Sequence, residues 1–259
     1  AANGVIVVTT KKGKAGETKV EINSLTSFDV PYLYPPIQNV YGQGEAGVFL
    51  PTTEYYSWGA KMEGQTVTDW TGKEVALTPQ PNNIKDFFRT GTNYTNSLTY
   101  STGTEKTTAY FSYTNTNATG VIPVNKLERH NFNLRLNTEL IKKLKMDFVI
   151  TWIRNSVDNA PVGGDDLFSP MWQLIKMPRN IRTADIKKAS YYDETGSLKQ
   201  LTWAPNSTGI INPYWSIKGR EAVDNNSFLN TISTLRYDVT PWMYVQLRGR
   251  LSTNNQDAE

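Results

Sequence analysis

The sequence TNSLTYSTGTEKTTAYFSYTNT, residues 95–116, contains two alternating segments separated by a connection of only a few residues. The first segment ends at Gly103, and the second, which begins at Lys106, places Ala109, Phe111 and Tyr113 on one face. Alternation with a period of two is typical of β-strands that bury a single face. A short connection brings neighbouring strands together in antiparallel order. The stretch therefore predicts two antiparallel strands with one apolar and one polar face.

The same alternation recurs along the chain and predicts seven strands, which begin near Val20, Thr95, Lys106, Leu127, Lys145, Ser227 and Trp242. Apolar members of the later strands are Phe132, Leu134, Leu136, Met146, Phe148, Ile150, Trp152, Leu229, Leu235, Tyr237, Met243, Val245, Leu247 and Leu251. Most segments are about as long as the roughly 9–11 residues that a tilted strand needs to cross the hydrocarbon core of a bilayer. Helical patterns are limited to residues 83–89 and to the stretch around 167–176.

Short and long connections alternate between these strands. The short ones are Gly103–Glu105, Leu140–Lys143 and Asp238–Trp242, and the long ones cover about residues 29–93, 117–126 and 155–226. Connections as long as the first and third are uncommon inside compact soluble domains. Short turns at one end and long loops at the other are typical of outer-membrane β-barrels.

The polar faces of the strands carry charges that a barrel lumen would hold. Four arginines lie on the polar faces of three predicted strands: Arg135, Arg236, Arg248 and Arg250. Aromatic residues gather near strand ends, as interfacial girdles require: Tyr94, Tyr100, Trp152, Tyr237 and Trp242. These features favour an all-β fold, an antiparallel transmembrane β-barrel. A soluble β-sandwich that binds carbohydrate remains the alternative, with its polar face in solvent.

Composition excludes several classes of site. The absence of cysteine excludes disulfides and thiolate chemistry, and a single histidine, His130, excludes a histidine-rich metal cluster. A net charge of +3 is too small to indicate a nucleic-acid partner. No run of apolar residues reaches the length of a transmembrane helix. The chain begins without an initiator methionine or a signal peptide, so we expect an internal piece of a longer protein.

The sequence predicts no enzyme, with no catalytic residues, metal or cofactor. It lacks the G-x-S-x-G, H-E-x-x-H and Walker motifs. His130 lies on a predicted strand without a recognisable serine or acidic partner. The pair Asp165–Asp166 follows two glycines and is interpreted as an exposed acidic turn. A calcium site or a β-rich glycoside hydrolase would be the alternative use of these carboxylates.

Aromatic residues in the first and third long loops are the candidates for ligand binding. Flat rings stack on sugar faces and peptide groups, while neighbouring polar side chains fix the orientation of a ligand. The predicted ligand-binding residues are Tyr55, Tyr56, Trp58, Trp70, Trp172 and Trp203. The alternative is that such rings form small cores that hold the loops together, an interpretation favoured for Trp215, which lies close behind Pro213.

Several blocks of the sequence resemble, in order, TonB-dependent transporters of the SusC/RagA family. GVIVVTTKKGKAG, residues 4–16, is similar to the closing segment of the family's plug domain, and ETKVEINS, residues 17–24, is similar to its first barrel strand. VYGQG, residues 40–44, resembles the early first loop. Residues 83–114 resemble the second and third strands, residues 118–137 the following loop and strand, and INPYW, residues 211–215, a motif that recurs later.

The resemblance implies a domain organisation. The family has a barrel of about 22 strands plugged by an amino-terminal domain. Residues 1–16 would be the end of the plug and its linker, and residues 17–259 the N-terminal part of the barrel, with about seven of its strands. Seven strands leave two open edges, so we expect that this part cannot transport by itself.

The resemblance also implies a function, partners and a location. The expected function is import of glycans or peptides across the outer membrane of a Gram-negative bacterium of the Bacteroidetes type. Expected partners are a SusD-like surface lipoprotein, TonB through an N-terminal part that this sequence does not contain, an oligosaccharide or peptide substrate, and outer-membrane lipid. A TonB-dependent receptor for siderophores or cobalamin is a further alternative.

Overall fold

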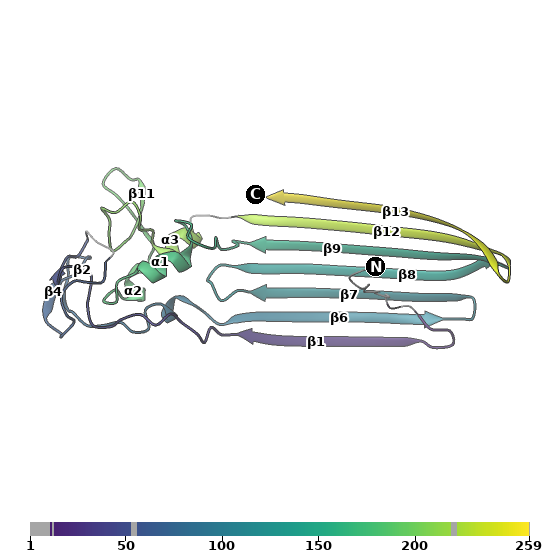
Figure 1. The fold of residues 1–259 in the computed structure, drawn as a ribbon, viewed down its shortest axis with the longest axis horizontal. Coiled ribbons are helices and arrows are strands. Elements are labelled where there is room, and N and C mark those ends of the chain that lie inside the picture. Colours follow the sequence, from purple (N-terminus) through teal and green to yellow (C-terminus); the bar gives the residue numbers. More distant parts are fainter. Residues whose placement is uncertain (1–10, 12, 53–55, 219–221, 259) are drawn as a thin grey trace, which may run out of the picture.

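The computed structural model describes residue 11 and residues 13–52, 56–218 and 222–258. Its main feature is one antiparallel sheet of seven strands in the order β1-β6-β7-β8-β9-β12-β13 (Figure 1). The strands are β1 (Lys19–Asp29), β6 (Gly91–Gly103), β7 (Thr107–Thr119), β8 (Lys126–Ile141), β9 (Leu144–Asp158), β12 (Val223–Thr240) and β13 (Met243–Ala258). The seven predicted strands are thereby confirmed. The predicted last strand of a plug, within residues 1–10, lies outside the described residues.

The hydrogen-bonded register places the predicted apolar residues on one face. Leu134 of β8 lies opposite Phe111 of β7 and Ile150 of β9. The next residue, Arg135, lies opposite Tyr110 and Val149 on the other face. Because directly opposed residues of neighbouring strands share a face, the alternation continues from strand to strand without a break.

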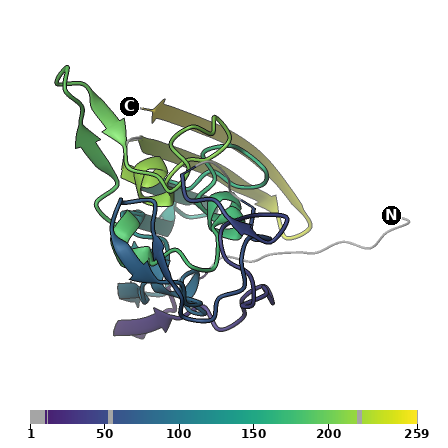
Figure 2. The same ribbon diagram turned by 90° about the vertical axis from the view of Figure 1, so that its left-hand side faces the viewer.

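The sheet is curved, as Figure 2 shows from the end at which the loops lie, with β1 at the bottom and β13 at the top. We call the face that carries Leu134 the apolar face and the face that carries Arg135 the polar face. The two faces differ in chemistry over the middle rows of the sheet, as the alternation predicts.

The connections follow the predicted alternation of lengths. Residues 104–106, 142–143 and 241–242 form short turns at one end, and residues 30–90, 120–125 and 159–222 connect strands at the other end. The first long loop holds β2 (Gly44–Glu45), β3 (Val48–Phe49), β4 (Thr66–Thr68), β5 (Glu74–Ala76) and the 3₁₀ turn η1 (Lys85–Phe87). The third holds α1 (Pro170–Lys176), α2 (Thr183–Ile186), β10 (Ser190–Tyr192), β11 (Leu198–Gln200) and α3 (Pro213–Lys218).

The two predicted helical stretches form different kinds of structure. The stretch around residues 167–176 forms α1, in which Ser169 caps the N-terminus and Pro170 takes a first-turn position that tolerates proline. The stretch 83–89 forms only one 3₁₀ turn, because the backbone becomes extended at Phe88. Among the described residues, none of the helices combines the length and apolarity needed to span a membrane.

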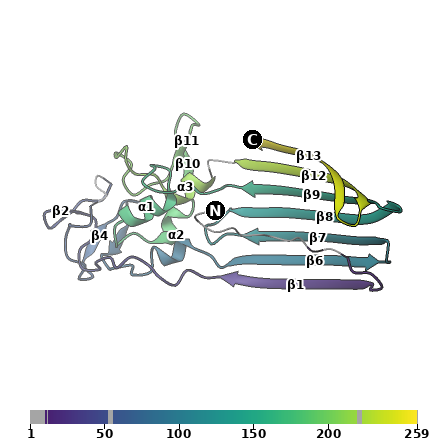
Figure 3. The same cartoon turned by 45° about the vertical axis from the view of Figure 1, so that its right-hand side comes forward.

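The buried core lies in the loops and not in the sheet. The first and third long loops pack together beyond one end of the strands, and we call this assembly the loop unit (Figures 1 and 3). Its largest buried apolar side chains are Leu77, Phe87, Leu174, Met177, Ile181, Ile186, Trp203 and Ile210. The loop unit thus has a core like that of a small soluble domain, which positions its surface for binding.

Candidate functional site

Polar contacts join the two long loops into one unit. The guanidinium group of Arg179 donates to the side chains of Asn39 and Asn83 and to the carbonyl of Pro81. Asn83 in turn donates to the carbonyls of Pro178, at 3.1 Å, and Ile181, at 3.2 Å. Burial lowers the pKa of Arg179 from its ordinary value, but an arginine with three acceptors keeps its charge. The loops are therefore held in one arrangement by a buried network.

The INPYW motif has a structural role inside this unit. Asn212 is fully buried, and its side-chain amide donates to the carbonyls of Ile186 and Leu201. Its side-chain oxygen accepts from the backbone N–H of Tyr214, at the first turn of α3, where Pro213 supplies a pre-set backbone angle. Burial raises the pKa of Tyr214. The motif therefore fixes α3 against the core.

The two candidate tryptophans of the third loop have different surroundings. Trp203 is 0% exposed, so it reaches a ligand only if the loop unit opens. Trp172 on α1 is half-buried, and the ammonium of Lys176 lies 4.8 Å from the centroid of its ring. A half-exposed ring beside a cation is suited to contact with an electron-rich or carboxylate-bearing ligand.

The candidates near the tip of the first loop lie at its surface. Tyr56 is exposed, and Trp58 is 61% exposed with its ring centroid 5.9 Å from that of Tyr41. Tyr55 lies outside the described residues. The exposed indole of Trp58, packed beside the ring of Tyr41, forms a flat apolar surface. Contact with water does not stabilise such a surface.

Trp70 lines the most enclosed site among these candidates. It borders a cavity of about 240 Å³ together with Asp69, Asn180, Arg182 and other residues of both loops. The guanidinium of Arg182 is held by Asp185 at 2.7 Å, and Asp69 accepts from the backbone of Thr71 at 2.8 Å. One flat ring among fixed polar groups is the arrangement that orients a sugar or peptide.

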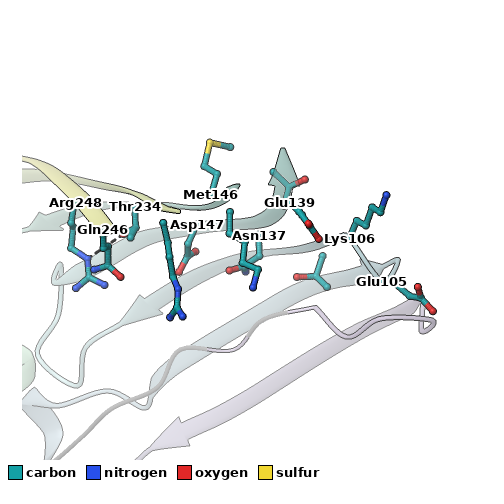
Figure 4. A pocket seen from close by; sticks show the side chains of 13 residues that line it. Glu105, Lys106, Asn137, Glu139, Met146, Asp147, Thr234, Gln246 and Arg248 are labelled. Carbon is teal, nitrogen blue, oxygen red and sulfur yellow. Dashed lines mark hydrogen bonds between the residues drawn. The ribbon is translucent and has the colours of Figure 1, made fainter. Parts of the chain in front are cut away.

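The polar face of the sheet carries a charged network near the short turns. Arg135 binds both carboxylate oxygens of Asp147, at 3.1 and 2.7 Å. Asp238 accepts from Lys145, at 2.9 Å, and from Arg236, at 2.7 Å. Of these residues, Asp147, Lys145 and Arg236 line a cavity of about 360 Å³. Figure 4 shows this cavity, with Met146 pointing away from the side on which Asp147 and Arg248 lie. The four predicted arginines share this polar face.

Residue 11 and residues 13–16 lie along the same polar face. A Cβ at Gly13 would lie 2.6 Å from the carbonyl oxygens of Thr102 and Ala109, so the chain approaches these strands more closely than a side chain permits. The N–H of Gly16 donates to the carbonyl of Gly103 at 2.9 Å. Lys11 borders a cavity with Tyr110, Ser112, Asn133 and Arg135 of this face.

His130 has partners that the sequence pattern did not reveal. Its Nδ1 lies 2.7 Å from the hydroxyl of Tyr113, and its Nε2 lies 2.9 Å from Oε1 of Glu128. The expectation that His130 lacks an acidic partner was therefore wrong. Glu128 is two residues away on the same strand, and this spacing places both side chains on one face.

No metal site is found among the described residues. They contain no cluster of three or more metal-binding side chains. Asp165 and Asp166 are exposed before α1, and Asp166 accepts from the backbone N–H of Phe168 at 2.7 Å. That contact is a local turn, as expected for this acidic pair.

Comparison with known proteins agrees with this architecture. No family model matches the chain. A TonB-dependent receptor, P3, from Formosa agariphila is 25% identical over 180 residues, which make up 67% of this chain and 16% of the relative. Structures of the RagAB peptide importer in its closed-closed and open-open states are 16% and 17% identical, with a TM-score of 0.65. They cover 99% and 100% of this chain, which spans 30% of theirs.

The curved sheet with two chemically distinct faces defines the chain as part of the wall of an antiparallel β-barrel. The chain is similar to the barrel of TonB-dependent transporters of the SusC/RagA family, in agreement with the resemblance seen in its sequence. The chain spans much less than half the length of these proteins. The relatives are by name receptors and importers and not enzymes.

Proposed function

We propose that the protein is part of a SusC-like, TonB-dependent importer of glycans or peptides in the outer membrane. The observation that carries this proposal is the seven-stranded sheet with one continuous apolar face, which matches the RagAB importer along the whole chain. An apolar face of this extent, on strands long enough to cross a bilayer, is stabilised by lipid. The proposal includes residues 1–16 as the end of a plug and residues 17–259 as the beginning of the barrel.

The orientation follows from the two ends of the sheet. Long loops are extracellular and short turns are periplasmic in this class of barrel. The loop unit then lies outside the cell, and the turns near residues 104–106, 142–143 and 241–242 face the periplasm. Residue 11 and residues 13–16 lie against the polar face, and Gly13 and Gly16 lie at the proposed periplasmic end, as a linker from a plug inside the lumen would.

The loop unit is the proposed place of first contact with substrate. Trp70 with its cavity, the exposed Tyr56 and Trp58, and the half-buried Trp172 supply flat rings on its surface. Trp203 supports these residues from the core and is left out of the contact set. The proposed function is binding and import, because this constellation holds no nucleophile with an activating base.

The proposed partner at the surface is a SusD-like lipoprotein, and the proposed source of energy is TonB. RagAB is a peptide importer by name, which makes a peptide substrate the first to test. A glycan uses the same stacking chemistry on flat rings. A siderophore or cobalamin receptor would instead bring a metal chelate to this surface.

The test is uptake by the intact transporter in its native host. Deletion of the gene should abolish growth on one peptide or glycan source, and the tagged protein should co-purify a surface lipoprotein. Trp70→Ala should reduce uptake more than tenfold if it removes a stacking contact and the cavity wall. Tyr32→Ala is the control, because this ring is 92% exposed in the same loop and borders none of these contacts. Uptake of a metal chelate alone would overturn the proposal.

A further inference from the structure

The apolar face of the sheet becomes polar near the loop end. Going from β1 to β12, the row Ile22, Leu98, Tyr113, Phe132, Trp152, Leu229 is followed by the row Ser24, Asn96, Asn115, His130, Arg154, Ser227. The next rows contain Tyr94, Asn117, Glu128, Ser156 and then Thr92, Thr119, Lys126, Asp158. The change in chemistry falls at the same register position in β7, β8, β9 and β12.

A groove of about 390 Å³ lies on these last two rows. Its lining includes Tyr94, Asn117, Lys126, Glu128 and Asp158, which belong to the four neighbouring strands β6, β7, β8 and β9. All four strands are paired on both sides, so the groove does not depend on the open edges of the sheet. It lies on the face opposite the charged network and the Gly13 segment.

Three charged groups in or beside the groove have no side-chain partner within the part of the chain that the structure describes. The side chains of Lys126, Arg154 and Asp158 make no ion pair or side-chain hydrogen bond there. On the polar face, by contrast, Arg129 donates to Asn155 at 2.8 Å. Unpaired charges side by side in a hollow are ready to bind an external ligand.

The floor of the groove is ordered by its own hydrogen bonds. The chain from Tyr113 through His130 to Glu128 connects the last apolar row to the groove. The hydroxyls of Thr92 and Thr119 lie 2.9 Å apart across β6 and β7. Side chains fixed in this way lose little entropy when a ligand binds.

Strand length places the groove directly above the hydrocarbon core in the proposed orientation. About 9–11 residues of a tilted strand cross that core. β8 has 16 residues and β9 has 15, so each extends past the core at the loop end. The groove therefore opens sideways at the depth of the headgroups, and not toward the lumen.

We propose that this groove binds the saccharide headgroup of a glycolipid in the outer leaflet, an inference that rests on the membrane position proposed above. Lys126 in the groove and Arg154 in the row beside it are balanced by Glu128 and Asp158 in the groove. This mixture suits hydroxyl groups, which both donate and accept, better than a phosphate. The ring of Tyr94 offers a face on which a sugar can stack. In this proposal, the groove holds a glycolipid at the outer rim of the barrel.

The test measures binding of purified native glycolipid to the delipidated, intact transporter in phosphatidylcholine nanodiscs. The double variant K126Q/R154Q should bind the glycolipid about tenfold more weakly, because it removes two charge-assisted donors. R129Q is the matched control: it neutralises an arginine of the same strand on the other face and should bind like the parent protein. Tyr94→Ala should weaken binding by a smaller factor through loss of stacking.

Two further measurements distinguish binding through the saccharide from binding through a phosphate, and the glycolipid proposal from the proposed import function. Enzymatic dephosphorylation of the glycolipid should leave its affinity unchanged, and inorganic phosphate should not compete. The saccharide site would be overturned if inorganic phosphate competed or if these residues bound a protein instead. It would also be overturned if R129Q lost as much glycolipid affinity as K126Q/R154Q. Uptake of substrate by K126Q/R154Q should remain normal. A parent protein that neither enters the outer membrane nor imports would instead overturn the proposed function.

Discussion

The sheet and the loop unit are stabilised in opposite ways. The loop unit buries Trp203, Phe87 and Leu174 almost completely, whereas Thr234 is the only buried residue other than glycine in the described part of the seven long strands. The loop unit therefore has a core of its own, and the sheet does not. A sheet that leaves both faces half-exposed needs lipid on one side and protein or water on the other. In the proposed membrane position, the sheet is therefore the part of the chain that depends on lipid.

The largest expected effect tests the core of the loop unit. Trp203→Ala should destabilise it by about 3–5 kcal/mol, because the substitution leaves a large cavity among buried side chains. Limited proteolysis of the transporter should then cut within residues 159–222 while the sheet stays intact. Trp58→Ala is the control, since that ring is exposed. Equal resistance of both variants to protease would contradict a cooperative core.

The second prediction tests the assignment of the two faces. Leu134→Arg should impair assembly in the membrane, at a cost of roughly 2–4 kcal/mol near the bilayer midplane. Asn133→Arg places the same charge one residue earlier on the polar face and should have a mild effect. Heat-modifiable mobility of the barrel on gels measures assembly. Equal damage from the two substitutions would refute the assignment.

The third prediction concerns the segment that runs along the polar face. Gly13→Ala should displace residues 13–16 from the sheet, because the new Cβ would meet two carbonyl oxygens at 2.6 Å. Overpacking of this kind costs about 1–3 kcal/mol. Hydrogen exchange at Gly16, which donates to Gly103, should become faster. Gly163→Ala, at a glycine with open space around it, is the control and should change nothing.

The smallest expected effect depends on pH and is confined to the hairpin formed by β10 and β11. Hydrogen bonds from Thr195 and Ser197 hold the pKa of Asp193 below its usual range. A lowered pKa contributes stability above the ordinary aspartate pKa, and that stability is lost as the pH falls through the lower, folded value. Amide exchange in the hairpin, corrected for intrinsic rates, should therefore lose protection in acid. In Asp193→Asn the same pH change should have no effect, and persistence of the loss there would count against this account.

The strands were predictable because their signal is local. Alternation at Phe132, Leu134 and Leu136 needs only neighbouring residues, and the register in the structure follows the same pattern. The contacts within the loop unit are not local. Arg179 and Asn83 are 96 residues apart, and no periodicity marks them as partners. The prediction of ligand contacts could not separate a buried Trp203 from an exposed Trp58, because burial there depends on how the two loops meet.

The groove on the outer rim was missed for a related reason. Tyr94 was interpreted as one residue of an aromatic girdle, and Lys126 and Asp158 belong to no recognised sequence motif. Only the register across β6, β7, β8 and β9 brings these side chains into two adjacent rows. A sequence shows which residues share a strand face, but the alignment of separate strands depends on loops of very different length.

The buried contacts of Arg179 have a mechanical consequence. The first loop connects β1 to β6, the third connects β9 to β12, and the two loops share one core. At the loop end, the shared core therefore links the strands from β1 to β12. At the opposite end, each short turn joins only two neighbouring strands, and no shared core links one pair to the next among the described residues. A force that widens the sheet should spread the turn end first, and the braced rim should keep its curvature until the loop unit itself unfolds.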